Sequence, residues 1–258
     1  MGLSLRVLVT RPKPAAARTA ARLRELGHDA VTMPLSAARH FPESISQVLS
    51  KPASGLVVTS AEALRAIGQT GDLVSIWKKL PIFAVGAATA QEAQALQFEN
   101  VIAGNGDGAL LAEIISSHAA GEALGAPLLY LAGTPRAQSL EQALREAAIP
   151  FEVCECYRMD AVQPSLDEQL RLLRGRRPDA VLHYSSESLR RFMELQAIVE
   201  APQLALDIVP YCLSRVIAEK LPGELYVRAK IAPNPSEESL LSLLSPAGSR
   251  PRSGISPA

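Results

Sequence analysis

Residues 150–159 of this chain have the sequence PFEVCECYRM. Phe151, Val153 and the two cysteines are apolar or small, and two glutamates lie between them, which is typical of a β-strand. The segment lies a little past the middle of the chain, and the sequences before and after it follow one plan. We therefore interpret it as a strand that carries the chain from one lobe to another, with Tyr157 facing the cleft between the lobes.

The composition indicates a globular chain. Its 258 residues are enough for one large domain or two of ordinary size, and 48% of them are hydrophobic while 20% are charged. No apolar run reaches the ~18 residues of a membrane span, and the apolar part of the N-terminus is too short for a signal peptide. We therefore expect a cytoplasmic protein without a membrane partner. A net charge of zero gives no support for a nucleic-acid surface.

The cysteines and histidines do not suggest a metal site. The three cysteines are an odd number without a C-x-x-C spacing, and the four histidines are scattered without an H-x-x-x-H or H-E-x-x-H spacing. We expect Cys154, Cys156 and Cys212 to be small core residues in a reducing compartment.

The chain begins with a β-α-β unit. Residues 5–10 form a continuous apolar run, as in a strand buried on both faces. An alanine- and arginine-rich helix is expected over residues 15–26 with Gly27 at its end, and a second strand over 28–33. Residues 36–50 are expected to be helical. Further strands are predicted at residues 55–58, 81–85 and 100–103, each followed by a helix.

The same plan starts again at residue 127. Strands and helices recur in the same order, at an offset of about 120 residues, which is too long for a solenoid repeat. We interpret this as a duplicated α/β half. A chance match of one α/β sequence with itself is the alternative, and the matching order of five strands with serine-rich turns at the same places argues against it.

The ends of the predicted strands carry small and hydroxylic residues. Ligands of open parallel sheets bind at these carboxyl ends, where helices begin. The residues there are Thr10–Arg11, Thr59–Ser60, Gly86–Thr89, Gly133–Thr134, Ser185–Ser186 and Cys212–Arg215. They include no His, Asp or Glu, and the chain has no G-x-S-x-G, P-loop or G-x-G-x-x-G motif. Each Ser or Thr alone could be a plain N-cap; the set together predicts an anion site of open helix N-termini.

These segments together resemble the uroporphyrinogen-III synthase family, over roughly residues 4–245. No single motif is specific, and the ordered set carries the likeness. The matching segments are VLVTRP (7–12), VVTS (57–60), AVGAATA (84–90), LLYLAG (128–133), VCECY (153–157) and the hydroxyl pair Ser185–Ser186.

The resemblance implies two parallel-sheet α/β lobes of flavodoxin-like type, duplicated halves joined by a two-stranded connector. One lobe then comprises residues 1–33 and 161–245, and the other comprises residues 35–151. Residues 33–36 and 152–160 would be the connector strands. Residues 246–258 are rich in Pro, Gly, Ser and Arg without apolar periodicity, and we expect a disordered tail.

The resemblance also implies a reaction in haem and tetrapyrrole biosynthesis. A cyclising hydro-lyase closes the polycarboxylate hydroxymethylbilane, with loss of water and inversion of the terminal (D) ring, to give uroporphyrinogen III. No cofactor or metal is implied, and we expect a monomer. The family's tyrosine falls on Tyr157, which would donate the proton to the leaving hydroxyl; the alternative is that Tyr157 only packs in the connector.

The residues implied to bind the substrate lie at the strand ends. Thr89 matches the threonine of a family Gly-x-x-Thr-Ala motif, while the second copy has Cys212 and Arg215 at the glycine and threonine places. This departure points to Arg215, or Ser214 beside it, as a carboxylate ligand. The full predicted set is Arg11, Thr59, Ser60, Gly86, Ala87, Thr89, Gly133, Ser185, Ser186, Ser214 and Arg215.

Two other functions are consistent with parts of the sequence. A two-lobed protein that binds a small anion without catalysis would need the same open helix ends, but it would not need Tyr157. A sugar-nucleotide transferase with two α/β lobes would need acidic catalytic residues, which the strand ends lack.

Overall fold

A computed structural model describes residues 4–104, 107–121 and 124–244. The chain divides into two compact units, which are described separately. Unit 1 comprises Met1–Ala37 and Ala161–Ala258, and unit 2 comprises Ala38–Asp160. Unit 1 is thus drawn from both ends of the chain and unit 2 from its middle. The predicted disordered tail, residues 246–258, lies outside the described residues.

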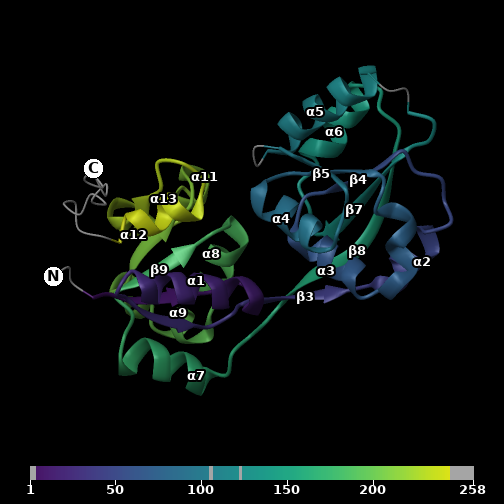
Figure 1. The fold of residues 1–258 in the computed structure, drawn as a ribbon. Helices are drawn as coiled ribbons and strands as arrows, with labels where there is room; N and C mark the ends of the chain where they lie inside the picture. Colours follow the sequence, from purple (N-terminus) through teal and green to yellow (C-terminus); the bar gives the residue numbers. More distant parts are fainter. Residues whose placement is uncertain (1–3, 105–106, 122–123, 245–258) are drawn as a thin grey trace, which may run out of the picture. The chain divides into compact units, whose positions relative to one another are not determined.

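Unit 1, which includes α1 and β9 in Figure 1, is built on a five-stranded sheet. Every strand pairing in this sheet is parallel. In spatial order the strands are β11 (Lys230–Ile231), β10 (Val209–Cys212), β9 (Ala180–His183), β1 (Arg6–Val9) and β2 (Asp29–Thr32). Helices α1 (Lys13–Glu25) and α13 (Glu237–Ser242) pack on one face. The other face is covered by α7 (Leu166–Leu170), a π-helical turn (Arg171–Gly175), α8 (Ser186–Met193), α9 (Gln196–Glu200), α10 (Gln203–Leu206), α11 (Arg215–Ala218) and α12 (Gly223–Arg228).

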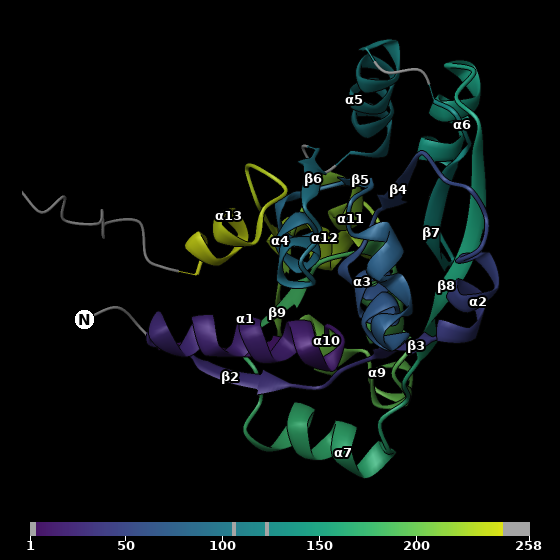
Figure 2. The ribbon, with the colours of Figure 1, turned by 45° about the vertical axis from the view of Figure 1, so that its right-hand side comes forward.

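Unit 2 is built on a six-stranded sheet. In spatial order the strands are β3 (Ser36–His40), β8 (Phe151–Ala161), β7 (Leu128–Thr134), β4 (Gly55–Val58), β5 (Pro81–Ala84) and β6 (Asn100–Ala103). Helices α2 (Pro42–Val48), α3 (Ala61–Gly68) and α4 (Ala87–Ala95) cover one face, with a 3₁₀ turn at Gly71–Trp77. Helices α5 (Gly108–Gly121) and α6 (Ser139–Glu146) cover the other (Figures 1 and 2).

Residues 36–50 differ from the prediction, which made the whole segment helical. Ser36–His40 form strand β3 at the edge of the sheet, and the helix α2 begins only at Pro42. The strand pairs with β8: the Phe41 amide donates to the Cys156 carbonyl at 2.8 Å, and the Val162 amide donates to the Leu35 carbonyl at 3.0 Å. The partner numbers fall as the residue numbers rise, so β3 runs opposite to β8. The chain passes between the units within these two strands, at Ala37–Ala38 and at Asp160–Ala161.

The two sheets share one topology because the copies exchange their first β-α-β units. In unit 1, β1 and β2 of the first copy lie beside β9, β10 and β11 of the second. In unit 2, β7 and β8 of the second copy lie beside β4, β5 and β6 of the first. Apart from the edge strand β3, each sheet therefore has the flavodoxin-like order 2-1-3-4-5 when its strands are counted from the exchanged unit. The predicted fold class, two mainly parallel α/β sheets with duplicated topology joined by two strands, is confirmed.

The central strands are buried on both faces, which explains their continuous apolar sequences. In β1, Leu8 packs toward one face of the sheet while Val7 and Val9 pack toward the other, and all three side chains are fully buried. Cys154, Cys156 and Cys212 are buried and free, as expected. No helix among the described residues is long and apolar enough to cross a membrane.

The His183 ring of unit 1 is buried without a polar partner. His183, the last residue of β9, is fully buried, and neither of its ring nitrogens has a hydrogen-bond partner among the described residues. Its ring lies against the ring of Phe192, with centroids 5.4 Å apart. Burial lowers the pKa of His183 to about 3, so the ring is neutral at ordinary pH.

Candidate active site

An irregularity in the pairing of β7 with β8 determines where Tyr157 points. Ala132 pairs with Glu155, but the next residue, Gly133, pairs with Tyr157, so that Cys156 is an extra residue in β8. Strict alternation would place Tyr157 on the same face as Glu155. The bulge instead turns Tyr157 to the face of Cys156, where both join the core beneath α3 and α4.

Gly133 provides the space that the Tyr157 ring occupies. A Cβ atom at position 133 would lie 2.2 Å from Cζ of Tyr157 and 2.5 Å from its hydroxyl oxygen. These distances are far below van der Waals contact, so any side chain at this position would displace the ring. Gly133, predicted as a substrate-binding residue from its place at a strand end, is therefore seen to seat the tyrosine.

The phenol of Tyr157 is held by a polar contact and by its apolar surroundings. The residue is 8% exposed, and its phenol interacts with the side chain of Ser60. Burial, the largest cause, raises the pKa of Tyr157 to about 12, while the Ser60 hydrogen bond lowers it. The phenol therefore keeps its proton through the neutral range, as a proton donor requires.

A Gly133→Ala substitution should reduce activity by displacing Tyr157. If Tyr157 takes part in the reaction, turnover should fall by about tenfold or more, since small misplacements of a reacting group are costly. Overpacking should lower the free energy of unfolding by about 1–3 kcal/mol. Combining it with Tyr157→Phe in a double-mutant cycle on steady-state turnover measures the coupling. If Gly133 acts by placing the Tyr157 hydroxyl, adding Gly133→Ala to Tyr157→Phe should reduce turnover little further. Losses of turnover that are fully additive would contradict this role. Gly175→Ala is the control, because a Cβ there meets nothing within 4 Å.

The other predicted residues of unit 2 lie at the ends of neighbouring strands. Ser60, after β4, caps α3 by accepting a hydrogen bond from the Glu62 amide, and the Thr59 hydroxyl lies 3.2 Å from that of Tyr130. Gly86, after β5, is the N-cap of α4 and supplies no side-chain cap, so Ala87 begins a helix whose first turn has no side-chain acceptor. Thr89 is buried in that first turn. These residues share the carboxyl edge of β4 and β5.

A histidine–carboxylate pair close to this edge was not predicted. Nε2 of His40 lies 2.9 Å from a carboxylate oxygen of Glu62, and Nδ1 of His40 lies 2.8 Å from Nε2 of Gln69. The charge of Glu62 contributes to raising the pKa of Tyr157, although it is the smallest of the causes. The sequence carries no signal for this pair, because His40 lies in a strand that was expected to be helical.

The predicted residues of unit 1 occupy the ends of three neighbouring strands. Ser185 caps α8 in a reciprocal capping box with Ser188, so its hydroxyl is used within the helix. Ser214 is the N-cap of α11 but makes no side-chain cap bond, and Arg215 beside it is exposed. Arg11, after β1, is already paired: its Nη1 lies 2.9 Å from Oε1 of Glu237.

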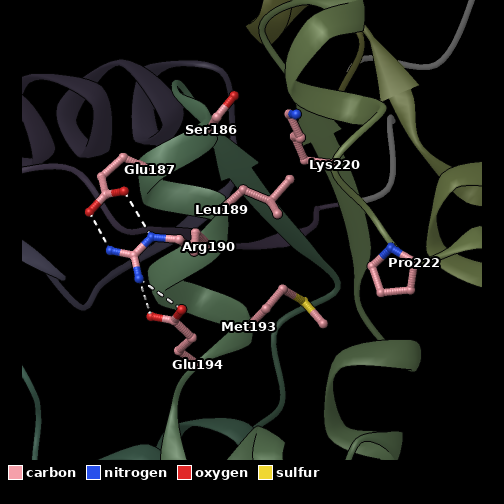
Figure 3. Close-up of a pocket in the computed structure, with 8 residues that line it drawn as sticks. All are labelled: Ser186, Glu187, Leu189, Arg190, Met193, Glu194, Lys220 and Pro222. Atoms are coloured by element: carbon pink, nitrogen blue, oxygen red, sulfur yellow. Dashed lines mark hydrogen bonds and ion pairs between the residues drawn. The ribbon is translucent and has the colours of Figure 1, made fainter. Parts of the chain in front are cut away.

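A pocket of about 460 Å³ in unit 1 includes one of the predicted residues, Ser186. Figure 3 shows it along the face of α8, with Leu189 and Met193 opposite Lys220 and Pro222. Arg190 does not offer a free charge, because Glu187 and Glu194 both bind its guanidinium group (Figure 3). The side chain of Lys220 makes no hydrogen bond or ion pair with any described residue, so its ammonium group is the cation that this pocket presents to a ligand.

The described part of the chain contains no group of three or more His, Cys, Asp or Glu side chains that could hold a metal ion. Burial raises the pKa of Cys156 to about 12, and that of Cys212 likewise, so these thiols are poor sources of thiolate.

Comparisons with known proteins agree with this geometry. The sequence model of one protein family, described as uroporphyrinogen-III synthase HemD, matches residues 17–242. The structure resembles uroporphyrinogen-III synthetase from Helicobacter pylori with a TM-score of 0.66 at 18% identity, over 93% of this chain and 97% of that one. It also resembles a mutant uroporphyrinogen III synthase from Thermus thermophilus, with a TM-score of 0.55 at 20% identity, over 93% and 96% of the two chains. At such identities the two structures support the fold.

Proposed function

Because the chain belongs to the uroporphyrinogen-III synthase family, we propose that it is a cyclising hydro-lyase that converts hydroxymethylbilane to uroporphyrinogen III. Water leaves the hydroxymethyl carbon, and the substituted carbon of the terminal ring attacks the resulting azafulvene. The spiro intermediate then reopens and closes with that ring inverted. The alternative of a small-anion binding protein without catalysis is set aside by the family membership.

The seating of Tyr157 is the observation that carries the proposed chemistry. Its hydroxyl donates a proton to the leaving hydroxyl of the bilane as the carbon–oxygen bond breaks, and water departs with the bonding electron pair. The lone pair of the adjacent pyrrole nitrogen stabilises the carbon that remains. The phenol regains a proton when ring closure releases one from the terminal ring. A positioned general acid of this kind contributes about 10²–10⁴-fold to the rate.

Carboxylate binding is assigned to the remaining strand ends. The uncapped first turn of α4, beginning at Ala87, presents backbone N–H groups together with the positive end of the helix dipole. In unit 1, Ser214 and Arg215 present a hydroxyl and a guanidinium group, and the pocket beside Ser186 presents Lys220 above an apolar wall. An apolar wall with one cation suits a pyrrole ring that bears a carboxylate side chain.

The activity is tested by product analysis. The purified protein is supplied with hydroxymethylbilane, and the porphyrin isomers are separated after oxidation. We expect the type III isomer in excess over the type I isomer that forms by spontaneous closure. Type I alone, from protein shown to be folded by circular dichroism, would overturn the proposed function.

A further inference from the structure

Three hydrogen-bond donors in unit 1 converge on one carboxylate oxygen. Oε1 of Glu237 accepts from Nη1 of Arg11 at 2.9 Å, from the Thr19 hydroxyl at 2.5 Å and from the Tyr184 hydroxyl at 2.6 Å. Arg11 and Thr19 lie eight residues apart, after β1 and in the helix α1, whereas Tyr184 follows β9 and Glu237 begins α13. The sheet brings these segments together, because it places β1 beside β9.

The donors are held in place independently of Glu237. The guanidinium carbon of Arg11 lies 3.9 Å from the centre of the Tyr184 ring, in the geometry of a cation–π contact. Nη1 of Arg11 also donates to the Thr19 hydroxyl at 3.1 Å, and Thr19 is fully buried. A guanidinium group and two hydroxyl groups fixed in this way form a receptor for a carboxylate.

Glu237 is attached to this receptor less firmly than the donors are. Its side chain is 41% exposed, whereas that of Arg11 is 26% exposed. It is the first residue of α13, a helix of 6 residues that is anchored by the buried Leu240 and Leu241. The helix therefore does not depend on the carboxylate for its place. Partly exposed ion pairs contribute little to stability, so exchanging this carboxylate for another one costs little.

The receptor lies at the carboxyl edge of the unit 1 sheet. Arg11 follows β1 and Tyr184 follows β9, the neighbouring strand, and Tyr184 directly precedes Ser185. This is the edge to which the binding of a polycarboxylate substrate is assigned above.

Building on the proposed function, we propose that Arg11, Thr19 and Tyr184 form a carboxylate subsite for the bilane, and that Glu237 is an internal carboxylate that occupies it until the substrate takes its place. Glu237 thereby satisfies Arg11 and the two hydroxyl groups when no substrate is bound. It also competes with the substrate, and this competition sets the apparent affinity.

The test is the KM for hydroxymethylbilane of the Glu237→Gln variant of the full chain. Loss of the competing charge should lower KM by about two- to fivefold, with kcat little changed. This factor corresponds to the free energy that a partly exposed ion pair contributes. Arg11→Met should raise KM by about tenfold or more, because a hydrogen bond to a charged group is lost. In the Arg11→Met background, Glu237→Gln should have no further effect.

Glu238→Gln is the matched control. Glu238 is the next residue of α13, so this substitution removes the same charge from the same helix without changing a residue of the receptor. Two results would overturn the proposed exchange of Glu237 with the substrate: a KM for Glu237→Gln equal to that of Glu238→Gln, or a KM higher than that of the unaltered protein. Glu237 would then be a residue that positions Arg11. Thermal unfolding of each variant verifies that α13 is retained. Failure of the proposed function can be told apart from failure of this subsite, because without that function the unaltered protein would give no excess of type III product.

Discussion

The Tyr157→Phe variant is expected to lose about 10²–10⁴-fold in turnover while it keeps the fold. The substitution removes only the hydroxyl, and the ring remains packed over Gly133 within the core beneath α3. Proton donation to the leaving hydroxyl is then left to solvent. Turnover and isomer composition, measured with hydroxymethylbilane in a coupled assay, would show the loss, and circular dichroism would show that the fold is retained.

The appropriate comparison is Tyr130→Phe. Tyr130 is a second buried phenol of the same sheet, with its hydroxyl 3.2 Å from that of Thr59, and its removal should change turnover by less than about tenfold because a neutral hydrogen bond contributes about 0.5–1.5 kcal/mol. An unchanged yield of the type III isomer from Tyr157→Phe would remove the proton-donor role. The raised pKa of Tyr157, about 12, also predicts that turnover shows no loss from its ionisation below about pH 11.

The second large effect is a loss of stability in mild acid that originates at His183. Its pKa is lowered from 6.5 to about 3 by burial. The unfolded chain therefore takes up a proton as pH falls below about 6.5, while the folded protein does not. The stabilisation is fully present above pH 6.5 and is lost as pH falls toward 3. At pH 5 the expected loss is about 2 kcal/mol, from 1.36 kcal/mol for each pH unit.

The His183→Leu variant should abolish this dependence. Leucine fills a similar volume, next to Phe192, without a group to protonate. Urea unfolding followed by circular dichroism at pH 7.5 and at pH 5.0 gives the two free energies of unfolding. The free energy of unfolding at pH 7.5 minus that at pH 5.0 should be smaller by about 2 kcal/mol in the variant than in the unaltered protein. Equal differences in the two proteins would show that His183 is not the cause. Trp77, the one tryptophan of the chain, lies in unit 2 and reports separately on that unit.

Strand periodicity and the internal repeat were sufficient to predict the fold class. Fully apolar runs such as residues 5–10 have one stable interpretation, a strand buried on both faces. The edge strand β3 was missed because its sequence, SAARH, has high helix propensity, and its pairing with β8 overrides that preference. Propensity is a local quantity, whereas the pairing joins residues more than a hundred positions apart.

The sequence placed the candidate residues at strand ends but gave no information on their contacts. Ser60 and Gly133 were chosen as candidates because ligands of parallel sheets bind at the carboxyl ends of the strands. Period-two alternation would have turned Tyr157 to the opposite face, since a bulge in β8 depends on the partner strand. The pairing of Arg11 with Glu237 likewise depends on residues that meet only in the finished sheet.

The exchange of β-α-β units has a consequence for the order in which the chain folds during synthesis. β1 and β2 leave the ribosome first, but β9, their neighbour in the sheet, begins only at Ala180. All of Ala38–Asp160 is synthesised in between. At about 5–20 residues per second, the first two strands wait on the order of ten seconds without a partner. Unit 2 can therefore be complete while β1 and β2 are still unpaired. In the nascent chain these two strands are exposed to aggregation and to capture by chaperones.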